Sequence, residues 1–243
     1  MPAVMTVLPE TTSIYGFLQR PSLVDFPGRV AAVFFTSGCN FACGFCHNAG
    51  LLQRRQAGLS ADKVRQTVRT FRNRDWVDGV VITGGEPTLC EDLSDLVSFF
   101  RREGLAVKLD TNGSRPTVLR EVLPLVDAVA MDVKCGPENY RALTGFGEPE
   151  TVAESIRLIL DAACSHEFRT TVIESFHTDD EMHAVGRMID GARRYTLQPF
   201  LPREDLPDPV LRAEPRTSPE RLRHLRTLMA PYAESVTIKG TTD

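Results

Sequence analysis

Short apolar runs alternate with amphipathic stretches along most of this chain, and this alternation constrains the fold more than any other feature of the sequence. The apolar runs are rich in Val, Ile, Leu and Phe and predict strands over residues 30–36, 79–83, 106–110, 127–133, 168–174 and 195–200. The intervals predict helices over residues 60–72, 93–103, 117–123, 151–164 and 179–191. Such an order is typical of an α/β fold whose parallel sheet is buried on both faces.

Two of the expected helices begin beside capping residues. Ser60 and Thr178 each precede acidic residues, and a hydroxyl at the N-cap with acids in the first turn favours helix initiation. Residues 201–218 are rich in Pro, Arg and acids and predict a loop. A last helix over 219–229 and a short strand over 234–239 are expected after it.

Length and composition limit the class of protein. A chain of 243 residues with 42% apolar residues can bury one substantial core, so we expect a single domain over 1–243, with its core at about 14–200 and a C-terminal loop, helix and strand over 201–243. The net charge of −4 argues against a nucleic-acid partner. No window approaches the roughly 18 apolar residues of a membrane span, and no signal peptide is evident. We therefore expect a cytoplasmic protein that binds neither membranes nor nucleic acid.

Polar or glycine-rich segments follow the carboxyl end of every expected strand. They are the cysteine loop after Thr36 and residues 83–87, 110–113, 131–134, 173–175 and 198–200. All carboxyl strand ends of a parallel α/β barrel share one rim, where ligands bind. We therefore predict a partial (β/α)6 barrel of parallel strands with helices outside, and one site at its rim.

The first of these segments carries Cys39, Cys43 and Cys46. Iron–sulfur clusters are usually held by four thiolates, so three leave one iron open for a small molecule. A zinc site would need a further ligand, and His47 directly follows Cys46, which makes it an awkward one. A disulfide framework belongs to small secreted domains. The loop therefore predicts a cluster with an open iron; the other cysteines are scattered singly at Cys90, Cys135 and Cys164.

Gly84, Gly85 and Glu86 follow the second expected strand. The two glycines let backbone groups approach a ligand closely, and Glu86 offers a carboxylate to an ammonium group. Glycine and proline also mark ordinary turns, so an ordinary turn here is an open alternative.

The later strand ends offer further candidate ligands. Asp110 and Thr111 carry oxygens suited to a ribose or a hydrated cation, although Asn-Gly after them also suits a simple turn. Lys134, beside Asp132, can hold a carboxylate or be an exposed lysine at a strand end. Ile173 is either core or the wall of a planar base. The histidines outside the cysteine loop are scattered and expected at the surface or in ordinary hydrogen bonds, so none is assigned to catalysis.

Together these motifs resemble those of the radical S-adenosylmethionine (SAM) enzymes, whose Cys-x3-Cys-x2-Cys loop this chain shares. Residues 15–17, 24–28, 35–39 and 46–48 resemble the opening of glycyl-radical-enzyme activases. Among these the chain is most similar to the anaerobic ribonucleoside-triphosphate reductase activating proteins, with pyruvate formate-lyase activating enzyme a relative. The resemblance covers about residues 14–200.

The resemblance implies a [4Fe–4S] cluster whose open iron takes the amino and carboxylate groups of SAM. It implies that the cluster is bound by Cys39, Cys43 and Cys46. It implies contacts to SAM from Phe45 and Ile173 at the adenine, from Gly84, Gly85 and Glu86 at the amino group, and from Lys134 at the carboxylate. By the same resemblance, Asp110, Thr111 and Asp132 are expected to surround a monovalent cation near the cofactor. The implied reaction is reductive cleavage of SAM to a 5′-deoxyadenosyl radical, which removes hydrogen from a glycine of a partner glycyl radical enzyme.

Two features depart from the pyruvate formate-lyase activases. These enzymes usually place a His where this chain has Leu201, and the chain lacks a second cysteine cluster. The electron is therefore expected from a separate flavodoxin or ferredoxin, under conditions poor in oxygen. A radical SAM enzyme acting on a small molecule, similar to 7-carboxy-7-deazaguanine synthase, is the alternative. A plain iron–sulfur electron carrier is a third reading, and it would not need residues 84–86 or Lys134.

Overall fold

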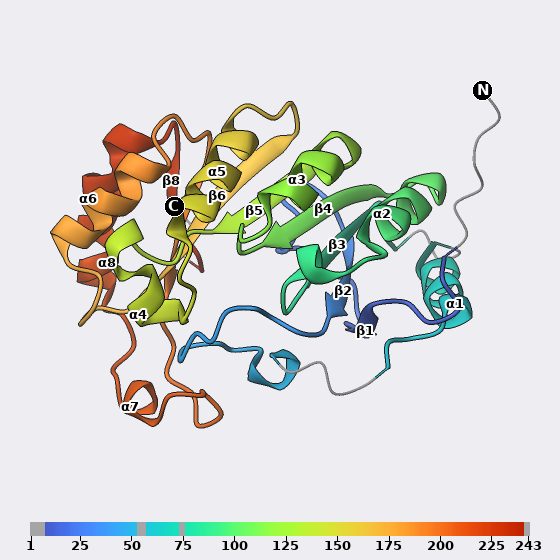
Figure 1. Cartoon of the computed structure of the whole chain (residues 1–243), viewed down its shortest axis with the longest axis horizontal. Coiled ribbons are helices and arrows are strands. Elements are labelled where there is room, and N and C mark those ends of the chain that lie inside the picture. Colours follow the sequence, from blue (N-terminus) through green and yellow to red (C-terminus); the bar gives the residue numbers. More distant parts are fainter. Residues whose placement is uncertain (1–7, 53–56, 73–75, 241–243) are drawn as a thin grey trace.

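A computed structural model describes residues 8–52, 57–72 and 76–240 of the chain. These residues form one eight-stranded sheet in which every strand pairs with the next in sequence (Figure 1). The first pair is antiparallel and every later pair is parallel. The strands are β1 (Ile14–Phe17), β2 (Ala31–Thr36), β3 (Gly79–Gly84), β4 (Ala106–Thr111), β5 (Ala128–Asp132), β6 (Ser165–Val172), β7 (Tyr195–Pro199) and β8 (Val236–Ile238).

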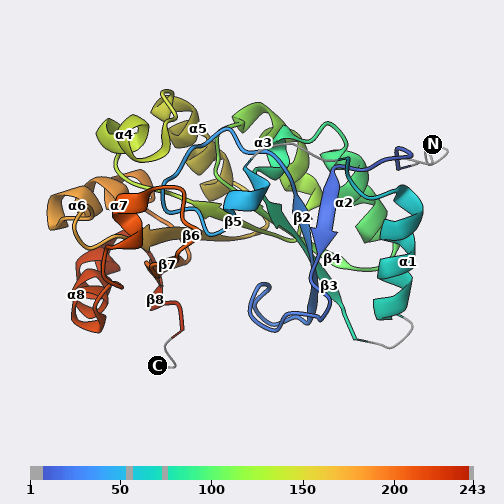
Figure 2. The ribbon, with the colours of Figure 1, turned by 90° about the horizontal axis from the view of Figure 1, so that it is seen from below.

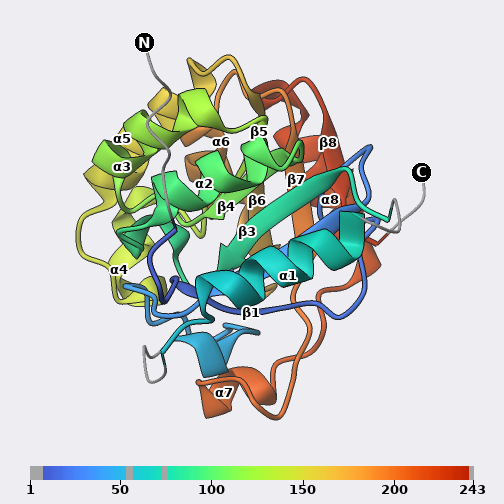
Figure 3. The same cartoon turned by 90° about the vertical axis from the view of Figure 1, so that its right-hand side faces the viewer.

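Helices cover the outer face of this curved sheet, and successive helices follow one another around it (Figure 3). The α-helices are α1 (Ala61–Arg72), α2 (Leu93–Arg102), α3 (Pro116–Val122), α4 (Tyr140–Thr144), α5 (Pro149–Leu160), α6 (Asp179–Met188), α7 (Pro209–Arg212) and α8 (Pro219–Met229). The 3-10 turns are η1 (Ala49–Leu51), η2 (Pro87–Leu89), η3 (Leu123–Leu125), η4 (Pro137–Asn139) and η5 (Ala230–Tyr232). None of the helices within residues 8–52, 57–72 and 76–240 is both long and apolar enough to cross a bilayer.

The sheet curls without closing, with β1 at one end and β8 at the other (Figure 2). Within the described ranges no pairing joins these two strands. The predicted partial barrel of parallel strands with outer helices is therefore confirmed, extended by an antiparallel strand at its start and a short parallel strand at its end.

Strand alternation separates the core from the lumen of the barrel. Phe34 pairs with Ile82, and both are fully buried in the main core with the helix residues. A smaller apolar cluster forms on the other face of the sheet, including Val33 and Val81. Lys108 lies directly opposite Val81 in the register, so the next strand brings charge to the lumen.

The predicted elements are present, with a few shifted ends. Strand β6 begins at Ser165, earlier than expected, because α5 ends at Leu160 and does not reach Cys164. Strand β1 and the short helices α4 and α7 were not predicted. The caps behave as expected: Thr178 Oγ1 accepts a hydrogen bond from Glu181 N at 3.2 Å, and Ser60 Oγ accepts one from Lys63 N at 3.2 Å.

Candidate active site

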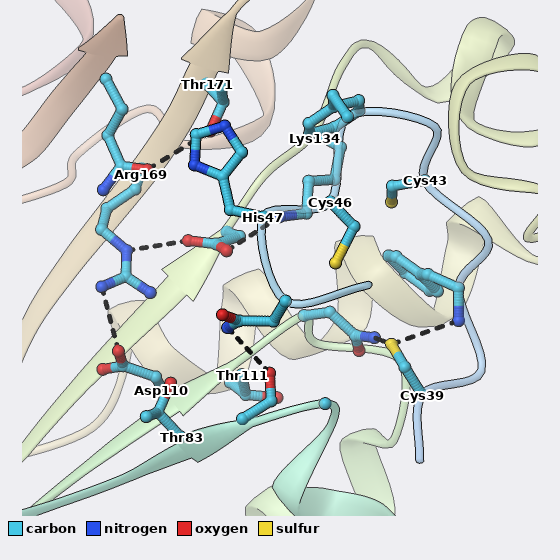
Figure 4. A pocket seen from close by; sticks show the side chains of 18 of the residues that line it. Cys39, Cys43, Cys46, His47, Thr83, Asp110, Thr111, Lys134, Arg169 and Thr171 are labelled. Atoms are coloured by element: carbon cyan, nitrogen blue, oxygen red, sulfur yellow. Dashed lines mark hydrogen bonds and ion pairs between the residues drawn. The ribbon is translucent and has the colours of Figure 1, made fainter. Parts of the chain in front are cut away.

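A cavity of about 310 Å³ lies at the carboxyl ends of the strands, beneath the cysteine loop (Figure 4). Strands β3 to β6 each contribute a polar side chain to it, and the three loop cysteines face it from the opposite side. The structure brings ten of the expected site residues to the wall of this cavity: Cys39, Cys43, Phe45, Cys46, Gly84, Gly85, Asp110, Thr111, Asp132 and Lys134. The expected convergence of distant strand ends therefore occurs.

Two expected residues, Glu86 and Ile173, lie away from the wall of this cavity. Ile173 is 1% exposed and lines a separate surface groove with Phe176 and residues of α4. Glu86 is fully buried beneath the rim. Neither side chain is therefore among the residues that line the cavity.

The cysteine loop is held by backbone hydrogen bonds at its start and in its middle. Gly38 N donates to Leu51 O at 2.7 Å, which ties the start of the loop to η1, and Ala42 N donates to Thr144 O at 2.7 Å, which ties its middle to α4. His47 Nε2 lies 3.1 Å from Leu201 O, so this imidazole is directed to the loop after β7. The three sulfurs consequently face the cavity from a supported loop.

The donor set fits an iron–sulfur cluster better than a single metal ion. Within the described ranges no three His, Cys, Asp or Glu side chains converge as the ligands of one ion. A cluster does not require such convergence, because each thiolate binds a different iron. Burial raises the pKa of all three thiols, that of Cys43 to about 12, so metal binding has to release protons. The residues that line the cavity do not include Cys90, Cys135 or Cys164.

The glycine pair packs against the base of the cysteine loop. Gly84 has φ +126°, and a Cβ there would lie 2.3 Å from Thr36 O. A Cβ on Gly85 would lie 2.1 Å from Gly38 O. Gly85 N also donates to Thr36 O at 3.0 Å. The glycines therefore permit close approach of two protein segments, besides exposing backbone to the cavity.

The Glu86 carboxylate fastens the end of β3 to the end of β4. Its Oε1 accepts hydrogen bonds from Thr88 N at 3.0 Å, Thr88 Oγ1 at 2.6 Å and Thr111 Oγ1 at 2.7 Å, while Oε2 accepts one from Asn112 N at 2.6 Å. Burial raises the pKa of Glu86, and these donors act in the opposite direction. With both oxygens already occupied, Glu86 positions Thr111 and Asn112 at the cavity.

Five side chains of alternating charge cross the lumen below the cysteines. This charged row consists of Lys108, Asp110, Arg169, Asp132 and Lys134. Arg169 Nε lies 2.8 Å from Asp132 Oδ1, and Arg169 Nη1 lies 3.1 Å from Asp110 Oδ2. Burial acts to raise the pKa of Asp132, but Arg169 and Lys134 outweigh it and hold that pKa well below its usual range. Burial also acts to raise the pKa of Asp110, but Arg169 and Lys108 outweigh it and lower that pKa, which favours the ionised form of both carboxylates.

Sequence reasoning missed Arg169, although a signal was present. Successive side chains of a strand point to opposite faces, so Arg169 and Thr171 share one face of β6, and Phe168, Thr170 and Val172 share the buried one. Arg169 and Thr171 line the cavity, whereas Phe168 is buried against the helices. Asn112 and Gln198, also at strand ends, were likewise not singled out and also line the cavity.

A buried imidazole fixes the segment that carries Lys134. His177 is fully buried; its Nδ1 accepts from Ile173 N at 2.9 Å, so Nε2 carries the proton and donates to Lys134 O at 2.9 Å. Lys134 N donates to Tyr140 Oη at 3.1 Å. Of the two settings expected for the histidines, surface or ordinary hydrogen bonds, His177 and His166 have the second: His166 is 3% exposed and its Nε2 accepts a hydrogen bond from Arg193 N at 3.1 Å.

Replacing His177 with glutamine is expected to reduce the loss of stability in mild acid. Burial lowers the pKa of His177 below its ordinary value of 6.5, so the unfolded chain binds this proton more readily than the native chain does. The stability is therefore complete above about pH 6.5 and is lost as the pH falls below it. We expect the Tm of the wild type to fall from about pH 7 to about pH 5, and that of His177→Gln to fall less.

Melting curves of the two proteins at several pH values test this expectation. His166, whose pKa burial also lowers, is present in both proteins, so the difference between the slopes isolates His177. Equal slopes would contradict a neutral His177 in the native state.

The sequence profile of the Radical SAM superfamily matches residues 33–189, from within β2 to just past the end of α6. This segment includes the cysteine loop, the glycine pair and the charged row described above. The chain belongs to the radical SAM superfamily.

The chain is similar in sequence to two named relatives and in fold to one solved structure. The chain is 30% identical over 233 residues to a Methanocaldococcus jannaschii protein named "putative glycyl-radical enzyme activating enzyme", which covers 90% of this chain and 94% of that protein. It is 31% identical over 127 residues to a Thermococcus kodakarensis "probable GTP 3′,8-cyclase", covering 51% of this chain and 41% of that protein. Streptococcus suis SuiB, in its complex with the precursor peptide SuiA, matches with a TM-score of 0.68 and 14% identity over 86% of this chain. This chain spans 48% of the SuiB chain, and the likeness shows the fold alone.

Proposed function

We propose that this protein activates a glycyl radical enzyme by removing a hydrogen atom from a glycine of that partner. The observation that carries the proposal is the open side of the cavity. Asp25, before β2, and Lys239, after β8, both line it, so the cavity extends to the gap between the two ends of the sheet. Leu23 and Val24, beside Asp25, are 73% and 76% exposed. An exposed apolar tip beside an open cavity suits a protein segment as substrate.

The similarity to an activating enzyme over nearly the whole of both chains supports the same proposal. When bound and reduced, the cluster and SAM supply a 5′-deoxyadenosyl radical. The chain's own residues hold these groups: Cys39, Cys43 and Cys46 ligate the cluster. Contacts to SAM come from Phe45, Gly84, Gly85, Asp110, Thr111, Asp132 and Lys134.

Two residues take supporting roles in this proposal. Glu86 acts through Thr111 and Asn112, to which its carboxylate is bonded. Ile173 acts through its backbone: its N–H donates to His177 Nδ1, and His177 Nε2 in turn donates to the backbone carbonyl of Lys134. Lys134 Nζ lies 2.8 Å from Asp132 Oδ2, and its remaining ammonium hydrogens are suited to a carboxylate of the cofactor.

We further propose a single radical SAM domain over residues 1–243 and a cytoplasmic location. Anaerobic ribonucleoside-triphosphate reductase is the proposed partner, with flavodoxin or ferredoxin as the electron donor. Anaerobic reconstitution with iron and sulfide, followed by reduction in the presence of SAM, should yield 5′-deoxyadenosine. Mixing with the candidate reductase should then produce a glycyl doublet in electron paramagnetic resonance, and its absence with every candidate reductase of the same genome would contradict the proposal.

Replacing both Leu23 and Val24 with aspartate is expected to separate the cleavage of SAM from the formation of the glycyl radical on the partner. Formation of 5′-deoxyadenosine without a partner should persist, because neither side chain is among the cavity-lining residues. Formation of the glycyl radical should fall by at least about tenfold, since charge replaces the apolar contact at a docking surface. Val210→Asp is the matched control, since Val210 is 73% exposed on α7. Equal loss in both variants would argue against this docking surface.

A radical SAM enzyme acting on a small molecule is the second candidate, and the similarity to a GTP 3′,8-cyclase favours it. That similarity covers only half of this chain. A function of this second kind predicts that purine nucleotides, rather than a reductase, stimulate cleavage of SAM. An electron carrier, in contrast, would form the cluster and yield no 5′-deoxyadenosine.

A further inference from the structure

Asp110 and Asp132, the carboxylates expected to surround a monovalent metal ion, are joined by an arginine. The Arg169 guanidinium spans them from β6, with one nitrogen on each carboxylate (Figure 4). Asp132 and Arg169 are register partners of adjacent strands, so the backbone itself sets this contact. We propose that Arg169 is the built-in cation of the site, and that this protein requires no monovalent metal ion there.

The oxygen atoms of the two carboxylates are paired with cationic side chains of the protein itself. Asp110 Oδ1 pairs with Lys108 Nζ and Asp110 Oδ2 with Arg169. Asp132 Oδ1 pairs with Arg169 and Asp132 Oδ2 with Lys134 Nζ. Each of the four oxygens thus already accepts from a cationic side chain. A metal ion seeking oxygen ligands would have to displace one of these partners.

The net charge of the charged row also disfavours a bound metal ion. The charged row holds two carboxylates and three cationic side chains, so its net charge is +1. Its side chains are only 4% to 29% exposed, which weakens screening by water. An added metal cation would raise the net charge to +2 in this half-enclosed place. One anionic ligand group at Lys134 would instead make the row neutral.

The planar guanidinium also takes the structural role that a metal ion would have between the two carboxylates. It fixes the distance between the carboxyl ends of β4 and β5 by two directed bonds. The positive charge of Arg169 is present whichever salt the medium contains, because arginine stays protonated. It is therefore a positioning residue for Asp110, Asp132 and, through Asp132, Lys134.

Cation binding by the cluster-free protein tests the proposal without any turnover. Equilibrium dialysis with radioactive rubidium should show no stoichiometric binding to the wild type, and one bound ion with Arg169→Ala. Stoichiometric binding by the wild type would overturn the proposal however the variant behaves. Because neither result depends on activity, failure here is distinguishable from failure of the proposed activase function.

Melting temperature in different salts gives the second readout. In potassium, sodium and choline chloride of equal ionic strength the wild type should melt at one temperature. Arg169→Ala should melt roughly 10 °C lower in choline chloride, because one oxygen of each buried carboxylate loses its cationic partner. It should recover in part in potassium or sodium. Arg169→Lys should stay indifferent to the cation.

Arg120→Ala, which breaks an exposed pair with Glu154, is the matched control and should change little. A purely structural Arg169 would predict the same loss for Arg169→Ala in all three salts. That result would overturn the assignment of Arg169 as the cation.

Discussion

Replacing Cys43 with alanine is expected to abolish assembly of the iron–sulfur cluster and, with it, all formation of 5′-deoxyadenosine. Cys43 is 6% exposed and supplies one of three thiols at the cavity. Two remaining thiolates would leave two irons of a cubane without protein ligands. Iron and sulfide content after anaerobic reconstitution, and the resonance signal of the reduced protein, should both fall to background.

Cys164→Ala is the matched control for this variant. Cys164 is half-buried just before β6 and is not among the residues that line the cavity. It should retain full iron content and full cleavage of SAM. A Cys43→Ala protein that kept its iron and its reduced signal would show that the cysteine loop does not hold the cluster.

The alternation of apolar runs with amphipathic stretches predicts the main strands, because most of these strands contain several buried apolar residues. Strands β2, β3 and β5 are buried along most of their length, so apolar residues occupy both of their faces, whereas β6 alternates between buried and partly exposed residues. The antiparallel strand β1 was missed because it is only four residues long and buries Ile14 alone. Its pairing with β2 depends on tertiary contact rather than on local pattern.

The site was predictable in its position and less so in the direction of its side chains. Parallel topology alone brings the strand ends to one rim, and the cysteine loop follows the first of them. Glu86 follows two glycines, one of which has φ +126°, so its direction depends on a backbone turn that the sequence does not specify. The ionic partners of Asp110 and Asp132 depend on which face of β6 carries Arg169, and that requires the register of the sheet.

Replacing Gly85 with alanine is expected to displace the cysteine loop. The new Cβ would lie 2.1 Å from Gly38 O and 2.7 Å from Gly38 C. These are backbone atoms next to Cys39, so no side-chain rotation can relieve the contact. Overpacking of this kind costs about 1–3 kcal/mol, which for a chain of this size lowers the Tm by roughly 2–12 °C. Cluster content should fall further than stability alone would explain, because Gly38 leads directly into the first ligand.

Gly16→Ala separates this local effect from the general cost of replacing a glycine. Gly16 lies in β1, and a Cβ there would meet nothing within 4 Å. The control should therefore keep its Tm and its cluster, since alanine in an open, extended position restricts the unfolded chain without straining the native one. Gly85→Ala with normal iron content and a lowered Tm would mean that the loop yields without losing its ligand geometry. Gly85→Ala with normal values of both would mean that the contact between the glycine pair and the cysteine loop is not needed to hold the three thiolates toward the cavity.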